Sequence, residues 1–130
     1  MKVVAVDYGS ARTGVAVSDP TGTIARPLGV VEGAAGDAGL RRLVDLIRAE
    51  EAERVVVGLP LTLRGERGAQ ARETEAFVEV LRAAVDVPVE SFDERFTTRL
   101  AQMSGDEPED ARAAAHLLSS YLEWSSTGRE

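Results

Sequence analysis

Two short apolar runs limit the folds open to this chain more than any other feature. They are "KVVAVDY" (residues 2–8) and "RVVVGLP" (residues 54–60), and both are rich in valine. Runs of this kind, without alternating polar residues, are typical of strands that are covered on both faces in α/β proteins. We therefore expect the two segments to pair with each other inside one sheet.

Turn signals after the first run predict two further strands. Residues 13–20, "TGVAVSDP", follow a short turn, and their side chains alternate along the segment. This pattern indicates a hairpin with the first strand. Pro20 and Gly22 favour a second turn. Residues 23–32, "TIARPLGVVE", then predict a third strand, and Pro27 places it at an edge of the sheet or at a bulge.

Apolar residues at helical spacing predict the helices. Asp37 is a candidate N-cap for the first of them. Phe96, Leu100 and Met103 share one helical face, so a helix should begin directly after the last strand. The predicted helices are 37–53, 70–85, one that follows a short strand at 87–92, and a final one that begins at about Pro108.

The resulting element order is βββαβαβαα, which predicts an α/β fold with a mixed five-stranded sheet and helices on both faces. At 130 residues the chain fits one domain. We expect that domain over residues 1–124 and a polar tail over residues 125–130. A chain of this length is too short for the two lobes with which an actin-like ATPase or a sugar kinase closes on its nucleotide.

Charge and cysteine content exclude several classes of function. The net charge of −7 argues against a protein that coats nucleic acid by bulk attraction, because such binding neutralises phosphates with lysine and arginine. The absence of cysteine excludes disulfides and thiolate metal sites. No apolar run approaches the roughly 18 residues of a membrane helix, and the sequence opens without a signal-peptide pattern, so we expect a cytoplasmic location and no membrane partner.

Acidic residues stand where the predicted strands end. Asp7 closes the first run, Asp93 and Glu94 follow the last strand, and Asp110 opens the final helix. Ligands of open α/β sheets gather beyond the carboxyl ends of parallel strands, so the topology would bring these acids to one edge. Converging carboxylates repel one another. They therefore take raised pKa values or bind a cation such as Mg²⁺ or Mn²⁺.

Each acid also has a purely structural interpretation. Asp7 would suit the start of the turn that follows it. Asp93 would suit the N-cap of the next helix, with Glu94 in its first turn. Asp110 would favour the dipole of the final helix. Spacing alone leaves both interpretations open for every one of these residues.

Four blocks of the sequence, in order, resemble one known family. They are "VVAVDYGSARTGVAVSD", "VVVGLPLTLRGERG", "DERFTT" and "DARAAAHLLSSYLE", and they extend from Val3 to Glu123. Together they resemble the YqgF/RuvX family, whose members are described as pre-16S rRNA nucleases or as Holliday junction resolvases. The resemblance implies a ribonuclease H-like fold and hydrolysis of nucleic-acid phosphodiesters that depends on Mg²⁺ or Mn²⁺. It maps the family's acidic residues, as catalytic residues and metal ligands, onto Asp7, Glu94 and Asp110.

Two segments depart from the family pattern. Thr62, Leu63 and Arg64 stand where relatives typically have an asparagine-containing turn. The segment "RLAQMSGDEPED" (residues 99–110) is short and acidic where the family has a longer basic one. Contacts to phosphates would then fall to other arginines, and the candidates are Arg12, Arg64, Arg67, Arg72, Arg95 and Arg99.

These observations lead to one main hypothesis and two alternatives. The main hypothesis is a metal-dependent nuclease that processes the 5′ end of the 16S ribosomal RNA precursor, in association with ribosome precursors. The first alternative is a Holliday junction resolvase acting on branched DNA, although precursor RNA is favoured as the partner. The second is an RNA-binding ribosome-maturation factor without catalytic activity. Both a monomer and a homodimer stay open.

Overall fold

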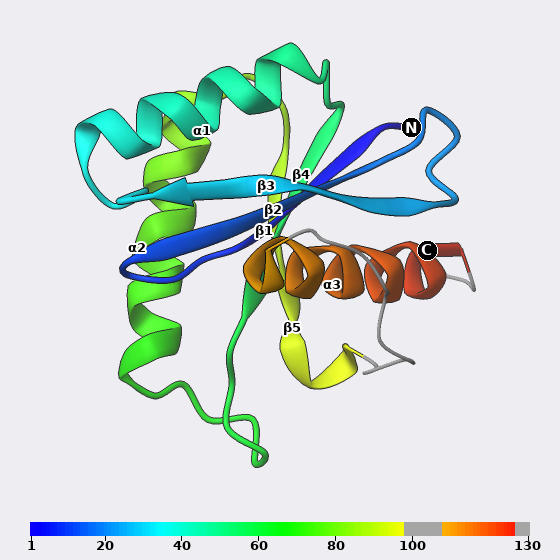
Figure 1. The fold of residues 1–130 in the computed structure, drawn as a ribbon. Helices are drawn as coiled ribbons and strands as arrows, with labels where there is room; N and C mark the ends of the chain where they lie inside the picture. Colours follow the sequence, from blue (N-terminus) through cyan, green and yellow to red (C-terminus); the bar gives the residue numbers. More distant parts are fainter. Residues whose placement is uncertain (98–107, 127–130) are drawn as a thin grey trace.

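The computed structural model describes residues 1–97 and 108–126, which form a five-stranded mixed sheet with helices on both faces (Figure 1). Across the sheet the strands follow the order β3-β2-β1-β4-β5. β1, β4 and β5 are parallel, and β2 is antiparallel to both of its neighbours. The elements are β1 (Val3–Asp7), β2 (Arg12–Ser18), β3 (Ala25–Glu32), α1 (Asp37–Ala49), β4 (Arg54–Leu59), α2 (Ala69–Ala84), β5 (Val89–Asp93), the 3₁₀ turn η1 (Glu94–Phe96) and α3 (Glu109–Ser126).

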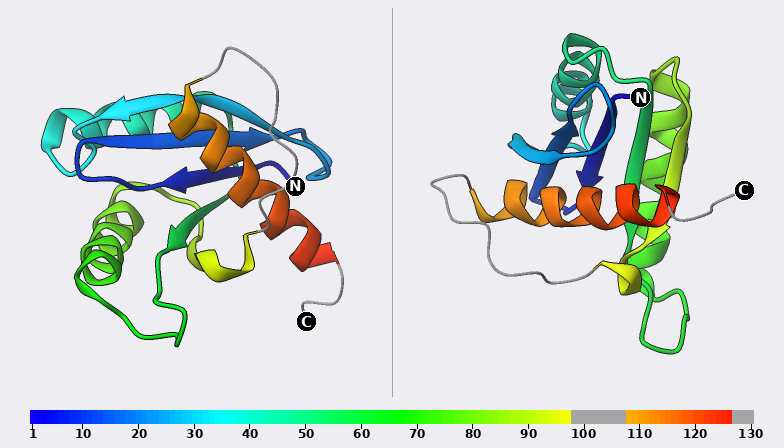
Figure 2. Two further views of the ribbon diagram at one scale, coloured as in Figure 1. Left: turned by 60° about the horizontal axis from the view of Figure 1, so that its bottom comes forward. Right: turned by 90° about the vertical axis from the view of Figure 1, so that its right-hand side faces the viewer.

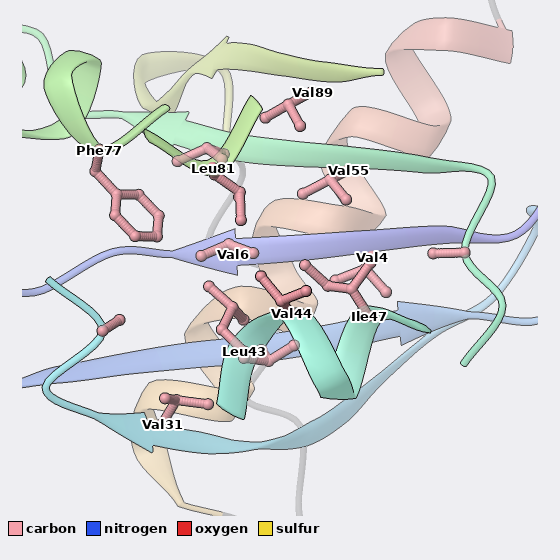
Figure 3. Close-up of a cluster of buried hydrophobic side chains, with 14 of the residues drawn as sticks. Val4, Val6, Val31, Leu43, Val44, Ile47, Val55, Phe77, Leu81 and Val89 are labelled. Carbon is pink, nitrogen blue, oxygen red and sulfur yellow. The ribbon is translucent and has the colours of Figure 1, made fainter. Parts of the chain in front are cut away.

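The sheet has a core on each face because its strands alternate side chains between two layers of helix. On one face α1 and α2 pack against the valines of β1 and β4 (Figure 3), and the main members of this core are Val4, Val6, Leu43, Ile47, Val55, Val57, Phe77 and Leu81. On the other face α3 packs against Ala5, Ala16 and Val56 through Ala114, Ala115 and Leu118. The alanines on both sides let α3 lie close to the sheet.

The predicted sheet is confirmed in detail. The two apolar runs are neighbours, since Val4 of β1 pairs with Val55 of β4 in parallel register. β3 is an edge strand, and the ladder between β2 and β3 shifts at Val15/Ala16, where Pro27 stands opposite Ala16. An edge position with an irregular ladder tolerates a residue without a backbone N–H. Within the described ranges no helix is long and apolar enough to cross a membrane.

Several boundaries differ from the predictions, and α1 ends at Ala49 instead of residue 53. Gly36, not Asp37, is the N-cap of α1, and no side chain caps that helix; Asp37 lies in its first turn, where a carboxylate favours the dipole instead. Directly after β5 the chain forms the 3₁₀ turn η1, and Thr97 then has an extended backbone, so the predicted helix does not begin at the end of the strand. The remainder of that predicted helix lies outside the described residues. α3 ends at Ser126, two residues into the predicted tail.

Candidate active site at the carboxyl end of the sheet

Asp7, the last residue of β1, lies on the face of the sheet that α3 covers. Val3 and Ala5 belong to the core beneath α3, and the period of two along a strand puts Asp7 on the same side. The residue is partly buried, in contrast to an acid that only starts a surface turn. Its position agrees with the prediction that the acid ends a buried strand.

Gly14 of β2 pairs with Asp7 and allows α3 to approach it. A Cβ built on Gly14 would lie 1.9 Å from the backbone oxygen of Asp110. No residue with a side chain fits there, so the first turn of α3 rests directly on the strand. This contact brings Asp110 to the same edge as Asp7, as the topology predicted.

Gly58 of β4 makes the corresponding space for Glu94. Val57 pairs with Val6, so Gly58 is level with Asp7. A Cβ on Gly58 would lie 2.7 Å from Oε2 of Glu94 and 3.0 Å from Cδ2 of Leu117. The carboxylate of Glu94 therefore occupies the surface of β4 beside Asp7, against the middle of α3.

The three acids form a row in which Asp7 is the middle member. Glu94 lies near Leu117, and Asp110 lies about 10 Å away along the same helix at about 1.5 Å per residue. Burial, and then the charge of Asp110, raise the pKa of Asp7. Burial, followed by the charges of Asp7 and Asp93, raises the pKa of Glu94 to about 7. The electrostatics thus place Asp7 near both of the other acids.

Asp110 is engaged by a cation from the chain itself. Nε of Arg12, at the start of β2, lies 3.0 Å from Oδ2 of Asp110. By contrast, the side-chain carboxylates of Asp7 and Glu94 have no hydrogen bond or ion pair with any described residue. With Asp110 turned toward Arg12, no three acidic or histidine side chains in the described ranges surround a single metal position.

Asp93 organises the turn that carries Glu94. Its Oδ1 accepts a hydrogen bond of 2.9 Å from the backbone N–H of Arg95, which confirms the predicted N-cap role. Both of its carboxylate oxygens also accept from the Arg95 guanidinium, at 2.6 to 3.1 Å. The hydrogen bonds from Arg95 hold the pKa of Asp93 below its ordinary value. Asp93 is a positioning residue in this structure, and Glu94 carries the carboxylate at the site.

Arg95 also fixes the loop between β4 and α2. Its Nη1 donates to the carbonyl oxygen of Leu63 at 3.3 Å, and its guanidinium lies against Gly65. The exposed side chain of Arg64 is next to Leu63 in that loop. The loop that contains Arg64 is thereby held beside the turn that carries Glu94 and Arg95.

The other predicted phosphate contacts are more dispersed. Arg67 forms an ion pair of 3.0 Å with Glu75, and Arg72 is exposed in the first turn of α2. Arg99 lies outside the described residues. The prediction did not include Gly14 and Gly58, although a glycine inside a strand is a recognised signal of close approach by another group.

The raised pKa of Glu94 predicts how stability depends on pH. Its folded pKa of about 7 exceeds the ordinary value of 4.5, so between these values the folded state binds more protons than the unfolded chain. The free energy of unfolding should therefore fall as pH rises from about 5 to 7, and the raised pKa of Asp7 acts in the same direction. Thermal melts of the metal-free protein in EDTA at a series of pH values will measure the fall.

Glu94→Gln removes the titrating group and should flatten this profile. Glu73→Gln, which changes an exposed carboxylate on α2, is the matched control and should leave the profile as in the wild type. Parallel profiles for Glu94→Gln and the wild type would contradict the assignment.

The chain is similar to proteins of one family over nearly its whole length. Residues 1–124 match the RuvX family, described as Holliday junction resolvase. A relative from Rubrobacter xylanophilus, named "Putative pre-16S rRNA nuclease", is 45% identical over 131 residues, which cover 94% of this chain and 92% of the relative. A relative of the same name from Chloroflexus aurantiacus is 39% identical over 93% of this chain and 86% of its own length.

A solved structure, Thermus thermophilus RuvC in complex with a Holliday junction substrate, superposes with a TM-score of 0.67. It is 17% identical and covers 98% of this chain and 96% of its own length. At that identity the likeness shows the fold, which is the ribonuclease H-like fold implied by the sequence resemblance. The family match spans nearly the whole chain, and the chain belongs to the RuvX family.

Proposed function

We propose that this chain is a divalent-metal-dependent nuclease that trims the 5′ end of the 16S ribosomal RNA precursor. The observation that carries the proposal is the row of Glu94, Asp7 and Asp110 at the carboxyl end of the sheet. Burial and then the charge of Asp110 raise the pKa of Asp7, and burial and then the charges of Asp7 and Asp93 raise that of Glu94. Such a row is costly for the folded protein when all members are ionised. A bound cation would remove that cost.

The residues present suit a hard divalent cation. Asp7 and Glu94 offer carboxylate oxygens without other partners among the described residues, and Mg²⁺ and Mn²⁺ prefer oxygen ligands. Asp7 would be shared, with Glu94 on one side and Asp110 on the other. When bound, such an ion supplies Lewis acidity, which lowers the pKa of water and offsets charge on phosphate oxygens.

Arginines would hold the substrate beside these acids. The side chain of Arg12 is 64% exposed while it pairs with Asp110, so a phosphate can reach it from solvent. At the other end of the row, Arg95 follows Glu94 directly in η1, and Arg64 lies in the loop that Arg95 contacts. Contacts of this type fix the register of a nucleic acid without reading its bases. Arg67, Arg72 and Arg99 stay predictions as further phosphate contacts.

Each of two alternative functions is supported by a specific observation. The family description and the RuvC-like fold favour a resolvase of branched DNA. The ion pair between Arg12 and Asp110 favours a maturation factor that binds RNA without cleaving it, because it engages one of the three acids. Cytoplasmic location, association with ribosome precursors and the choice between monomer and homodimer belong to the same proposal.

A cleavage panel tests the proposed function. The substrates are 16S precursor RNA with its 5′ extension, an unrelated single-stranded RNA and a four-way DNA junction, each with Mg²⁺, Mn²⁺ or EDTA. We expect cleavage within the 5′ extension with either metal ion and none in EDTA. Preferred cleavage of the junction would establish the resolvase instead. Binding of precursor RNA without cleavage under any condition would establish the maturation factor.

A further inference from the structure

An aromatic cluster with two exposed rings lies beside the proposed active site. Phe92 is buried at its centre, and its ring centroid lies 6.0 Å from Phe96, 5.6 Å from Tyr121 and 5.5 Å from Trp124. The outer members face solvent, since Phe96 is 57% exposed and Trp124 is 41% exposed. Large apolar side chains at the surface of a small domain mark a binding surface when they cluster.

The position of Phe96 ties this cluster to the acids. Phe96 and Glu94 belong to the same 3₁₀ turn, which follows β5 directly. The turn lies near the C-terminal half of α3 (Figure 2), and Phe92 of β5 contacts Tyr121 and Trp124 there. The edge-to-face contact with Phe92 holds the Phe96 ring in place while leaving more than half of it exposed. The ring is thus a firm surface next to a proposed catalytic carboxylate.

The charged residues beside the Phe96 ring indicate which kind of ligand binds there. Arg95 directly precedes Phe96 and keeps 34% of its side chain exposed while it pairs with Asp93, and Arg64 is exposed in the loop that Arg95 contacts at Leu63. An exposed aromatic ring with arginines in the same turn and in the adjoining loop is a combination with which proteins hold single-stranded nucleic acid, through base stacking and phosphate contacts. A protein surface as occupant would instead favour a wider apolar area.

We propose that Phe96 is a stacking platform for one unpaired base of the nucleic acid, immediately beside the bond that is cleaved. The proposal rests on the proposed nuclease function and adds a substrate requirement to it. Bases inside a duplex are stacked on their neighbours and expose only their edges. The platform therefore selects strands that are unpaired at this position, whether RNA or the open part of a branched DNA.

Binding measurements separate stacking from charge attraction. A labelled single-stranded RNA of about 12 nucleotides and a blunt duplex of the same length are titrated in EDTA, which keeps the RNA intact, and anisotropy gives both affinities. Phe96→Ala and Phe96→Leu should weaken single-strand binding about 10-fold and leave duplex binding unchanged. Phe96→Tyr, which keeps the ring, should bind as the wild type does. The single tryptophan, Trp124, should lose fluorescence when single-stranded RNA binds.

Leu63→Ala is the matched control, because Leu63 is 94% exposed on the adjacent loop and has no ring. It should leave both affinities as in the wild type. Equal single-strand binding by Phe96→Leu and the wild type would overturn the platform, as would equal losses for single strand and duplex. Cleavage of RNA by the wild-type protein tests the nuclease function separately from the stacking role of Phe96. Cleavage with an unchanged Phe96→Leu affinity rejects only the platform, and ring-dependent binding without cleavage rejects only the nuclease.

Discussion

Asp7→Asn will reduce cleavage by on the order of 10³-fold, the size of loss seen when one key electrostatic group is removed from a hydrolytic site. Asp7 is the middle member of the row, so its loss affects the positions next to Glu94 and next to Asp110 alike. Asparagine keeps the shape of the side chain but removes the charge. The protein should melt at the same temperature as the wild type or higher, because burial and the charge of Asp110 both oppose ionisation of Asp7.

Single-turnover cleavage of precursor RNA with Mn²⁺, paired with thermal melts at pH 8, measures both effects. Asp45→Asn is the matched control, since it makes the same chemical change on the exposed side of α1. Calorimetric titration with Mn²⁺ should show weaker binding in Asp7→Asn and wild-type binding in Asp45→Asn. Wild-type cleavage by Asp7→Asn would refute the assignment of the site.

The sheet could be predicted because its signals are local. Each pattern predicts the structure of the segment in which it occurs, as do the valine runs of β1 and β4 and the turn residues between β1, β2 and β3. Once β1 was recognised, the period of two fixed the face of Asp7 relative to Val3 and Ala5. Glu94 and Asp110 were candidates from their places after the last strand and at the start of the final helix, and the family resemblance implied that they act together with Asp7.

Other features could not be predicted, because they join segments that are distant in the sequence. The pair of Arg12 and Asp110 joins the start of β2 to the start of α3, and nothing in either segment identifies the partner. Arg12 was expected only to contact phosphate. Directly after β5 the chain forms a 3₁₀ turn, at whose start Asp93 binds both the backbone and the side chain of Arg95. Apolar spacing carries no information about such a contact.

Gly14→Ala should have the largest effect on stability of any single methyl added to this sheet. The new Cβ would meet the backbone oxygen of Asp110 at 1.9 Å, and backbone cannot move aside as a flexible side chain can. The first turn of α3 must shift, at a cost of about 3 kcal/mol in the free energy of unfolding. For a domain of this size that corresponds to a melting temperature lower by about 10 °C, measured by calorimetry. Cleavage should fall as well, because the shift carries Asp110 away from Asp7.

Gly29→Ala tests whether the loss comes from the close approach and not from the methyl group itself. Gly29 lies in β3, opposite Val15, and a Cβ there would meet nothing within 4 Å. Alanine should be neutral or slightly stabilising at that position, because glycine loses more backbone entropy on folding. The melting temperature of Gly58→Ala should lie between those of Gly14→Ala and Gly29→Ala, because its Cβ meets the side chains of Glu94 and Leu117, which can move. This substitution should impair cleavage more than stability. Equal melting temperatures for Gly14→Ala and Gly29→Ala would mean that α3 does not rest on β2 as described, and the placement of Asp110 beside Asp7 would fail with it.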